Sequence, residues 1–267
     1  MPIAAIPSLN LHYERAGAGE PLLFISGTGG DLRNKPNVFD GPLAKAFDVL
    51  AYDQRGLGQS DKPDQAYSMA DYADDAAALM TALGWDSAHV VGVSFGGMVA
   101  QELVLRHPSR VRRLVLACTS PGGAGGASFP FHEIDHLQGE ARARHLAPIS
   151  DTRQDAAWQA ANADLFAQII AMTATDPFAA EPGRAEGARR QLQARAGHDV
   201  WDRLPQVKTP TLIAAGRFDG IATPQAQLNL AMQIPGSSLR FFKGGHMFMI
   251  QDRTATPAMI DFLNGKA

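Results

Sequence analysis

The stretch Gly92-Val93-Ser94-Phe95-Gly96 decides the fold of this chain, because it places a serine between a predicted strand and a predicted helix. The strand is the short, β-branched run 88–91, and the helix runs from about Gly97 to Leu105, ahead of Pro108, which cannot continue it. A serine on so tight a turn adopts a strained backbone that lifts its hydroxyl clear of the sheet, and the glycines on either side let neighbouring backbone approach. The alternative is an ordinary Ser/Gly turn, and the strand–turn–helix context argues against it.

A serine hydroxyl is a weak nucleophile at neutral pH, so this turn predicts a histidine base and an acid that orients the histidine. The run 211–215 is typical of a buried strand and is followed by Asp219, and the run 239–242 is typical of a strand and is followed by His246 on a glycine turn. Because sites in open α/β sheets lie at the carboxyl ends of the strands, we expect Ser94, Asp219 and His246 to meet there.

Other residues compete for these two roles. The chain has eight histidines, and only His246 follows both a strand and a glycine turn in the right place; six of the others are His89, His107, His132, His136, His145 and His198. Asp219 would also suit a turn or a helix cap. The strand that ends at 117–120 carries no carboxylate, however, which leaves the other common position of the acid empty and favours Asp219.

Acyl transfer also needs donors aimed at the oxyanion of the tetrahedral intermediate. One expected donor is the backbone N–H of Phe95, directly after the serine. The other is the backbone N–H of Thr28, in the glycine-rich loop 26–30 that follows the predicted strand 21–25. The alternative is that these glycines only turn the chain.

Over nearly its whole length the chain resembles the α/β-hydrolase fold superfamily. The resemblance rests on the loop 26–28, the serine turn, the Asp219/His246 pair and the stretch 53–60, which is similar to the D-x-R-G-x-G-x-S loop of these proteins. That last similarity implies a turn-organising pair, Asp53 and Arg55. Within the superfamily the chain looks most similar to small bacterial esterases, 3-oxoadipate enol-lactonases and cofactor-free haloperoxidases, although Ser26-Gly27 stands where many of these proteins carry His-Gly.

The order of patterns along the chain predicts one core with one insertion. Short β-rich runs alternate with helical patterns from residue 9 to 120, which implies a mostly parallel sheet with flanking helices. One helix, over 73–83, is preceded by the capping-box pattern of Ser68 and Asp71. A glycine-rich hinge at 121–128 then precedes helical patterns up to about 204. We therefore expect an α/β-hydrolase core over 1–120 and 205–267, and an inserted helical lid over 121–204.

The substrate contacts are less determined. The apolar residues of the lid include Phe129, Phe131, Trp158 and Phe166. Their helical spacing favours a place in the lid's own core. Some of them must nevertheless contact the substrate if the lid covers the site. Arg33 follows the loop 26–30, which is called the oxyanion loop below because it carries the predicted donor Thr28. This arginine could hold a substrate carboxylate. The lid arginines could do so equally, and the sequence does not choose among Arg142, Arg144, Arg184, Arg189, Arg190 and Arg195.

Composition narrows the function classes. A net charge of −3 gives no reason to expect nucleic acid or an anionic membrane as a partner. Cys118, the single cysteine, cannot form a disulfide within the chain, and the N-terminus lacks the pattern of a signal peptide, so we expect a cytoplasmic protein. No metal or organic cofactor is implied, because ligand clusters and nucleotide motifs are missing from the sequence. The oligomeric state is left open.

These patterns predict a serine hydrolase that cleaves a small-molecule carboxylic ester or lactone through an acyl-enzyme. A serine at the turn argues against the aspartate chemistry of halide displacement and epoxide opening. The alternatives are a C–C bond hydrolase or lyase and a cofactor-free perhydrolase or haloperoxidase with the same triad, and, less expected, a non-catalytic binding module. Activity on vinylogous diketones, peroxide-dependent halide oxidation, and a ligand that binds without being consumed would distinguish them.

Overall fold

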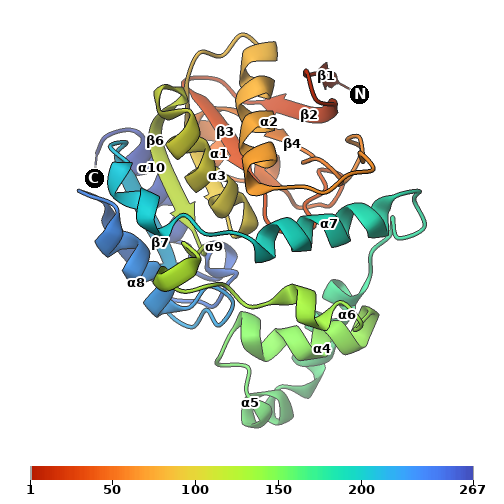
Figure 1. Ribbon diagram of the computed structural model, residues 1–267. Helices are drawn as coiled ribbons and strands as arrows, with labels where there is room; N and C mark the ends of the chain where they lie inside the picture. The colour runs from red at the N-terminus through yellow and green to blue at the C-terminus, as the bar shows by residue number, and fades with distance from the viewer. Residues whose placement is uncertain (1, 267) are drawn as a thin grey trace.

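A computed structural model describes residues 2–266, and Figure 1 shows the course of the chain. The strands are β1 (Ile3–Ala5), β2 (Asn10–Ala16), β3 (Pro21–Ile25), β4 (Asp48–Tyr52), β5 (Ala88–Val93), β6 (Val111–Ala117), β7 (Thr211–Gly216) and β8 (Ser238–Phe242). The helices are α1 (Leu43–Ala46), α2 (Met69–Ala82), α3 (Phe95–Arg106), α4 (Gly139–Ser150), α5 (Ala156–Ala161), α6 (Ala163–Ala174), α7 (Arg184–Ala196), α8 (Pro224–Gln233), α9 (Phe248–Gln251) and α10 (Ala255–Leu263). Short 3-10 helices are η1 (Val38–Asp40), η2 (Pro108–Arg110), η3 (Gly123–Gly125), η4 (Phe131–Ile134) and η5 (Trp201–Gln206). No helix within residues 2–266 has both the length and the apolar character needed to cross a bilayer.

The strands described in residues 2–266 form one eight-stranded sheet in the order β1-β2-β4-β3-β5-β6-β7-β8. From β4 to β8 every neighbouring pair is parallel, whereas β1–β2 and β2–β4 are antiparallel. The central strands are almost entirely buried, as expected for parallel strands covered on both faces. The predicted mostly parallel sheet is confirmed, with an antiparallel edge at its N-terminal side.

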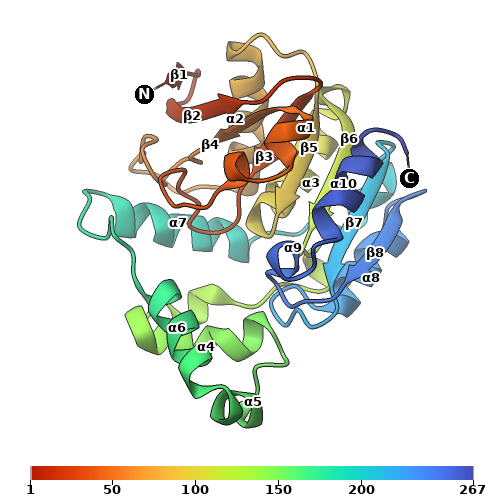
Figure 2. The ribbon, with the colours of Figure 1, turned by 180° about the vertical axis from the view of Figure 1, so that it is seen from behind.

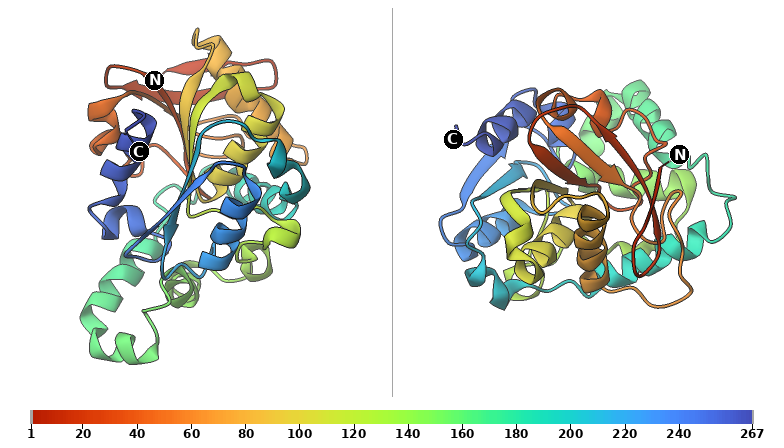
Figure 3. Two further views of the ribbon diagram at one scale, coloured as in Figure 1. Left: turned by 90° about the vertical axis from the view of Figure 1, so that its left-hand side faces the viewer. Right: turned by 90° about the horizontal axis from the view of Figure 1, so that it is seen from above.

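Two hydrophobic clusters fill the space between the sheet and the helices on its two faces. One cluster packs α2, α3 and α8 against the sheet through residues that include Tyr72 and Leu230. The other packs α1, α9 and α10 through residues that include Phe248 and Met259. The first group of helices faces the viewer in Figure 1 and the second in Figure 2, while Figure 3 shows the molecule from the side and from above. The sheet is therefore the middle layer of three.

Two helices begin earlier than the sequence predicts. The capping box of Ser68 and Asp71 is present, and because Ser68 itself is the N-cap, α2 starts at Met69 rather than near residue 73. Helix α3 starts at Phe95, directly after Ser94, rather than at about Gly97. Both differences have the same cause, which is that the turn residue is the last one outside the helix.

The insertion between β6 and β7 is helical, and its helices pack in two different ways. Helices α4 and α6 share a small cluster of their own, in which Phe166 and Ile170 are buried beside Ala143 and Ala147. Figures 1 and 2 show α4, α5 and α6 together at one end of the molecule, whereas α7 lies across the core. The division into a 121–204 lid and a core stays a prediction, but α7 contacts the core over its length.

The glycine-rich run 121–128 is packed rather than extended. Gly122 pairs with Asp199 in an isolated bridge, and the Val200 N–H donates to the Pro121 carbonyl over 3.0 Å. A Cβ at Gly122 would overlap the His198 carbonyl. Several of its glycines allow close approach to the segment after α7, and the interpretation of this run as a flexible hinge stays a prediction.

Candidate active site

Ser94 lies on the turn between β5 and α3, with φ 55° and ψ −115°. A Cβ at Gly96 would overlap the Ile25 carbonyl of β3, and one at Gly92 would overlap the Gly96 carbonyl. The two glycines are thus needed because backbone passes directly over them, as the sequence predicts. The turn holds Ser94 in a conformation that residues other than glycine rarely adopt.

His246 and Asp219 reach Ser94 from the loops that follow β8 and β7. The Nε2 atom of His246 lies 2.9 Å from Ser94 Oγ, and its Nδ1 atom lies 2.9 Å from Asp219 Oδ2. Because a carboxylate only accepts, Nδ1 carries the proton donated to Asp219, which leaves Nε2 free to accept the Ser94 hydroxyl proton. The structure therefore brings together the three side chains that the sequence singles out.

Asp219 is fixed by its own loop. Its second oxygen, Oδ1, accepts the backbone N–H groups of Ile221 and Ala222 at 2.8 and 2.9 Å. The side chain is buried, with only 1% of its surface exposed. The Oδ2 atom consequently keeps one direction, toward His246.

The loop after β3 passes beside Ser94. A Cβ placed on Gly27 would lie 3.4 Å from Ser94 Cβ, so the loop that carries Thr28 runs against the turn that carries Ser94. The Phe95 N–H, at the first position of α3, has no acceptor within its own helix. Both groups lie on segments that adjoin Ser94, and their role as oxyanion donors stays a prediction.

Three side chains outside the predicted triad and oxyanion donors hold this loop, and one of them, Arg195, is among the lid arginines between which the sequence does not choose. Gln54 donates from Nε2 to the Ser26 carbonyl over 2.9 Å, and Gln191 of α7 accepts the Gly29 N–H through Oε1 over 2.9 Å. Arg195, also of α7, donates from Nη1 to Thr28 Oγ1 over 2.7 Å. Gln54 stands inside the 53–60 motif and could have been suspected there, whereas no local pattern singles out Gln191.

Asp53 and Arg55 are both structural, but they are not a pair. Asp53 accepts the backbone N–H groups of Leu32 and Gln59, at 2.7 and 2.9 Å. The Arg55 guanidinium instead pairs with the buried Asp75 of α2, with 2.6 Å between Nε and Oδ2. Asp53 thus ties the 53–60 loop to Leu32, in the segment that follows the 26–30 loop, and Arg55 ties it to α2.

The aromatic candidates for substrate contact divide into two groups. Phe129 and Phe131 pack edge to face with 5.3 Å between ring centroids, and the Phe129 N–H donates to the Ile221 carbonyl in the Asp219 loop. Phe166 is instead buried in the cluster of α4 and α6, with Trp158 packed against that cluster. Only the first pair is tied to a loop of the candidate site.

Arg33 is engaged by two carboxylates. It pairs with Asp31 over 2.8 Å and also with Glu181, and its guanidinium lies 3.6 Å above the Phe178 ring. Burial alone would raise the pKa of Asp31, but hydrogen bonds from Arg33 and Arg184 outweigh burial and lower that pKa to about 2. The charge of Arg33 is therefore already balanced within the protein, which weakens the hypothesis that it binds a substrate carboxylate.

Fold and site together define an α/β enzyme of the hydrolase type. The chain belongs to the alpha/beta hydrolase fold family, whose model matches residues 20–252. It is 31% identical over 95% of its length to a Variovorax paradoxus protein named putative carbamate hydrolase RutD, of which 96% is covered. It is 33% identical over 98% of its length to the 2-hydroxymuconate semialdehyde hydrolase of Pseudomonas sp. strain CF600, of which 92% is covered. The crystal structure of the enol-lactonase from Burkholderia xenovorans LB400 aligns with a TM-score of 0.80 at 27% identity, over 98% of this chain and 100% of that one.

Proposed function

We propose that this hydrolase cleaves a small-molecule carboxylic ester or lactone, with Ser94 as nucleophile, His246 as general base and acid, and Asp219 as the group that orients the histidine. The observation that carries the proposal is the unbroken relay from Ser94 Oγ through the His246 ring to Asp219, with 2.9 Å at each hydrogen bond. Nucleophile and base at this separation are in position for proton transfer.

In the first half of the reaction, His246 Nε2 takes the Ser94 proton while Oγ attacks the carbonyl carbon. The carbonyl oxygen becomes an oxyanion, which accepts hydrogen bonds from the N–H groups of Phe95 and Thr28. Collapse of this intermediate breaks the C–O bond, and the leaving alkoxide takes the proton from His246. For a lactone, the alkoxide stays attached to the acyl group.

In the second half, a water molecule gives its proton to His246 Nε2 and attacks the acyl-enzyme. The second oxyanion collapses, Ser94 leaves and regains the proton from His246, and a carboxylic acid is released. Asp219 stabilises the imidazolium form of His246 in both halves and does not itself take up a proton.

The insertion is proposed to act as a lid, and its contacts with two catalytic loops support this. The end of α4 accepts hydrogen bonds from both loops: the Gly220 N–H donates to Ile149 over 3.0 Å, and the His246 N–H donates to Ser150 over 2.6 Å. A segment that covers the site at this place would exclude water and shape the space in which the substrate binds.

A second candidate reaction follows from the names of the relatives. Two proteins with at least 31% identity over most of their length are named as hydrolases of a carbamate and of 2-hydroxymuconate semialdehyde. The same serine, base and oxyanion donors could act on either substrate class, with the residues around the acyl group deciding between them.

The test combines a fluorophosphonate probe, read by intact-protein mass, with time-courses on short-chain p-nitrophenyl esters and small lactones. We expect one adduct and turnover in the wild type, no adduct with Ser94→Ala and a loss of kcat of about 10⁶-fold. Asp219→Asn should lower kcat by about 10⁴-fold, because the histidine loses its orienting acceptor. Ser238→Ala, at the exposed start of β8, serves as the control and should behave as wild type.

Two results would change the proposal. Folded wild-type protein with neither adduct nor turnover would overturn it. An adduct without turnover of esters or lactones would keep the nucleophile and reject the substrate class, and carbamates and 2-hydroxymuconate semialdehyde would then be tested.

A further inference from the structure

Arg195, in the last turn of α7, is a buried cation that has no carboxylate partner within residues 2–266. It is 6% exposed, and its guanidinium donates to two neutral hydroxyls, Thr28 Oγ1 and Ser128 Oγ, each at 2.7 Å. The guanidinium also lies 4.4 Å from the centroid of the Phe131 ring. These contacts use two of its five N–H donors.

The other arginines of α7 are paired with acids. Arg184 pairs with Asp31 and Asp176, and Arg189 and Arg190 pair with Glu186. The contrast matters because an unpaired charge is costly to bury. Burial lowers the pKa of Arg195 to about 10, and the charge of Asp219 opposes that shift only in part, so the guanidinium is still protonated at neutral pH.

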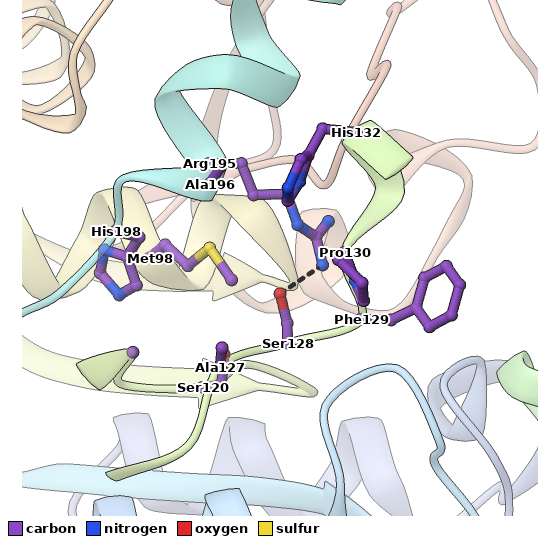
Figure 4. Close-up of a pocket in the computed structure, with 11 residues that line it drawn as sticks. Met98, Ser120, Ala127, Ser128, Phe129, Pro130, His132, Arg195, Ala196 and His198 are labelled. Atoms are coloured by element: carbon purple, nitrogen blue, oxygen red, sulfur yellow. Dashed lines mark hydrogen bonds between the residues drawn. The ribbon is translucent and has the colours of Figure 1, made fainter. Parts of the chain in front are cut away.

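A cavity of about 80 Å³ is lined in part by this arginine. Figure 4 shows Arg195 among the other side chains that line the cavity. Its eleven lining residues are Met98, Ser120, Gly122, Ala127, Ser128, Phe129, Pro130, His132, Arg195, Ala196 and His198. The lining contains no Asp or Glu, so the charge of Arg195 is not balanced there. The space exceeds what one water molecule needs and is small for a large ligand.

Two further polar side chains of this cavity lack partners. Ser120 Oγ and both ring nitrogens of His198 form no hydrogen bond within residues 2–266. The Ser120 backbone lies near the His198 ring and acts to raise its pKa, but less strongly than burial lowers it. Burial lowers that pKa to about 4, so the imidazole is neutral at pH 7 and carries one N–H donor. The cavity therefore combines a cation with two neutral groups that can each donate a hydrogen bond.

The cavity adjoins the proposed catalytic residues. Arg195 is bonded to Thr28, whose N–H is the proposed oxyanion donor, and Met98 lies one helical turn after Ser94. Phe129 is tied through its N–H to Ile221 in the Asp219 loop. The lining of the cavity is therefore connected to the elements that carry the proposed oxyanion donor, the nucleophile and Asp219.

We propose that Arg195 binds a free carboxylate of the substrate in this cavity, assisted by Ser120 and His198. The substrates would then be monoesters or lactones of acids that keep one carboxylate a short distance from the scissile bond. The planar guanidinium matches a carboxylate, and the small volume favours that group over a bulkier anion. This inference rests on the proposed ester or lactone hydrolysis at Ser94.

The test compares substrates that differ only in a terminal carboxylate. Monoethyl succinate, glutarate and adipate are paired with ethyl butanoate, pentanoate and hexanoate, and hydrolysis is followed by pH-stat titration. We expect kcat/KM to favour at least one charged member over its neutral partner by about 10- to 100-fold. Arg195→Gln should bring that ratio near one, and Arg195→Lys should keep part of it.

The control is Arg189→Gln, which removes a positive charge from the exposed side of the same helix and should keep the wild-type ratio. Because each variant is judged by its own ratio, a general loss of activity in Arg195→Gln cancels. Circular dichroism and thermal unfolding establish that the variants are folded. Equal rates for charged and neutral partners in the wild type, or a preference unchanged in Arg195→Gln, would overturn the inference and leave the proposed function intact.

A binding experiment separates the two proposals. Calorimetry on Ser94→Ala should detect the half-esters, with at least 10-fold weaker binding once Arg195→Gln is added. If no ester is hydrolysed by the wild type but this charge-dependent binding is seen, ester hydrolysis is refuted and the carboxylate site is retained. If the half-esters bind no better than the neutral esters, the carboxylate site is refuted.

Discussion

At Ser94 the backbone conformation is unfavourable for any residue with a Cβ, at a cost of about 1–3 kcal/mol. Packing imposes it, because Gly92 and Gly96 let β5, α3 and the end of β3 approach more closely than side chains allow. The hydroxyl is thereby held toward His246 without relying on a mobile loop. At the scale of the residue, the placement of the Ser94 hydroxyl depends on two neighbours that carry no side chain.

Gly96→Ala tests this dependence. The added methyl would overlap the Ile25 carbonyl, so we expect a loss of about 3 kcal/mol or more in the free energy of unfolding, measured by urea denaturation. Gly41→Ala is the control: its φ is −100°, and its new Cβ would meet Val38 O at an ordinary 3.5 Å, so a change within about 0.5 kcal/mol is expected. Equal destabilisation of the two variants would contradict the packing explanation.

At the scale of the element, helix α7 is part of the insertion in sequence but is attached to the core in space. Gly187 packs so closely on Gly56 that a Cβ there would overlap the Gly56 carbonyl. Farther along the helix, Gln191 and Arg195 bond to the oxyanion loop. We infer that α7 fixes the position of that loop, whereas the end of α4 contacts the loops of Asp219 and His246 instead.

Gln191→Ala tests the role of α7. It removes the acceptor of the Gly29 N–H, so the oxyanion loop should shift and kcat should fall by roughly tenfold, measured on whichever ester the wild type hydrolyses best. Gln193→Ala, an exposed glutamine on the same helix, should leave kcat unchanged. A similar kcat for the two variants would show that α7 does not position the loop.

For the molecule as a whole, buried His198 predicts a loss of stability in mild acid. Burial lowers its folded-state pKa to about 4 from 6.5, so between those values the unfolded chain binds the proton and the folded chain does not. The stability contribution is complete above pH 6.5 and is lost as the pH falls toward 4, by about 3 kcal/mol in total.

Urea denaturation at pH 7, 5.5 and 4 checks this expectation. The free energy of unfolding should decrease less steeply toward low pH in His198→Gln than in the wild type. His136→Gln, which replaces an exposed histidine, should keep the wild-type slope. Parallel pH profiles for wild type and His198→Gln would show that His198 is not the origin of the acid sensitivity.

Much of the architecture was predictable because it is encoded locally. The strand–turn–helix around Ser94, the strands before Asp219 and His246 and the capping box at Ser68 are each specified by a few adjacent residues. Parallel strands then bring their carboxyl ends to one edge of the sheet. The prediction that Ser94, Asp219 and His246 meet at that edge follows from this rule.

Only the tertiary structure decided which charged side chains have an oppositely charged partner and which do not. Arg33 and Arg195 are indistinguishable by local pattern, yet Arg33 faces Asp31 and Glu181 while Arg195 faces two hydroxyls. The Arg195–Thr28 contact joins residues 167 positions apart, and the packing of Phe129 against the Asp219 loop is also long-range. Sequence by itself therefore determined the fold and the candidate triad. The choice of Arg195 as the residue proposed to bind a substrate carboxylate depends on long-range contacts, which only the tertiary structure shows.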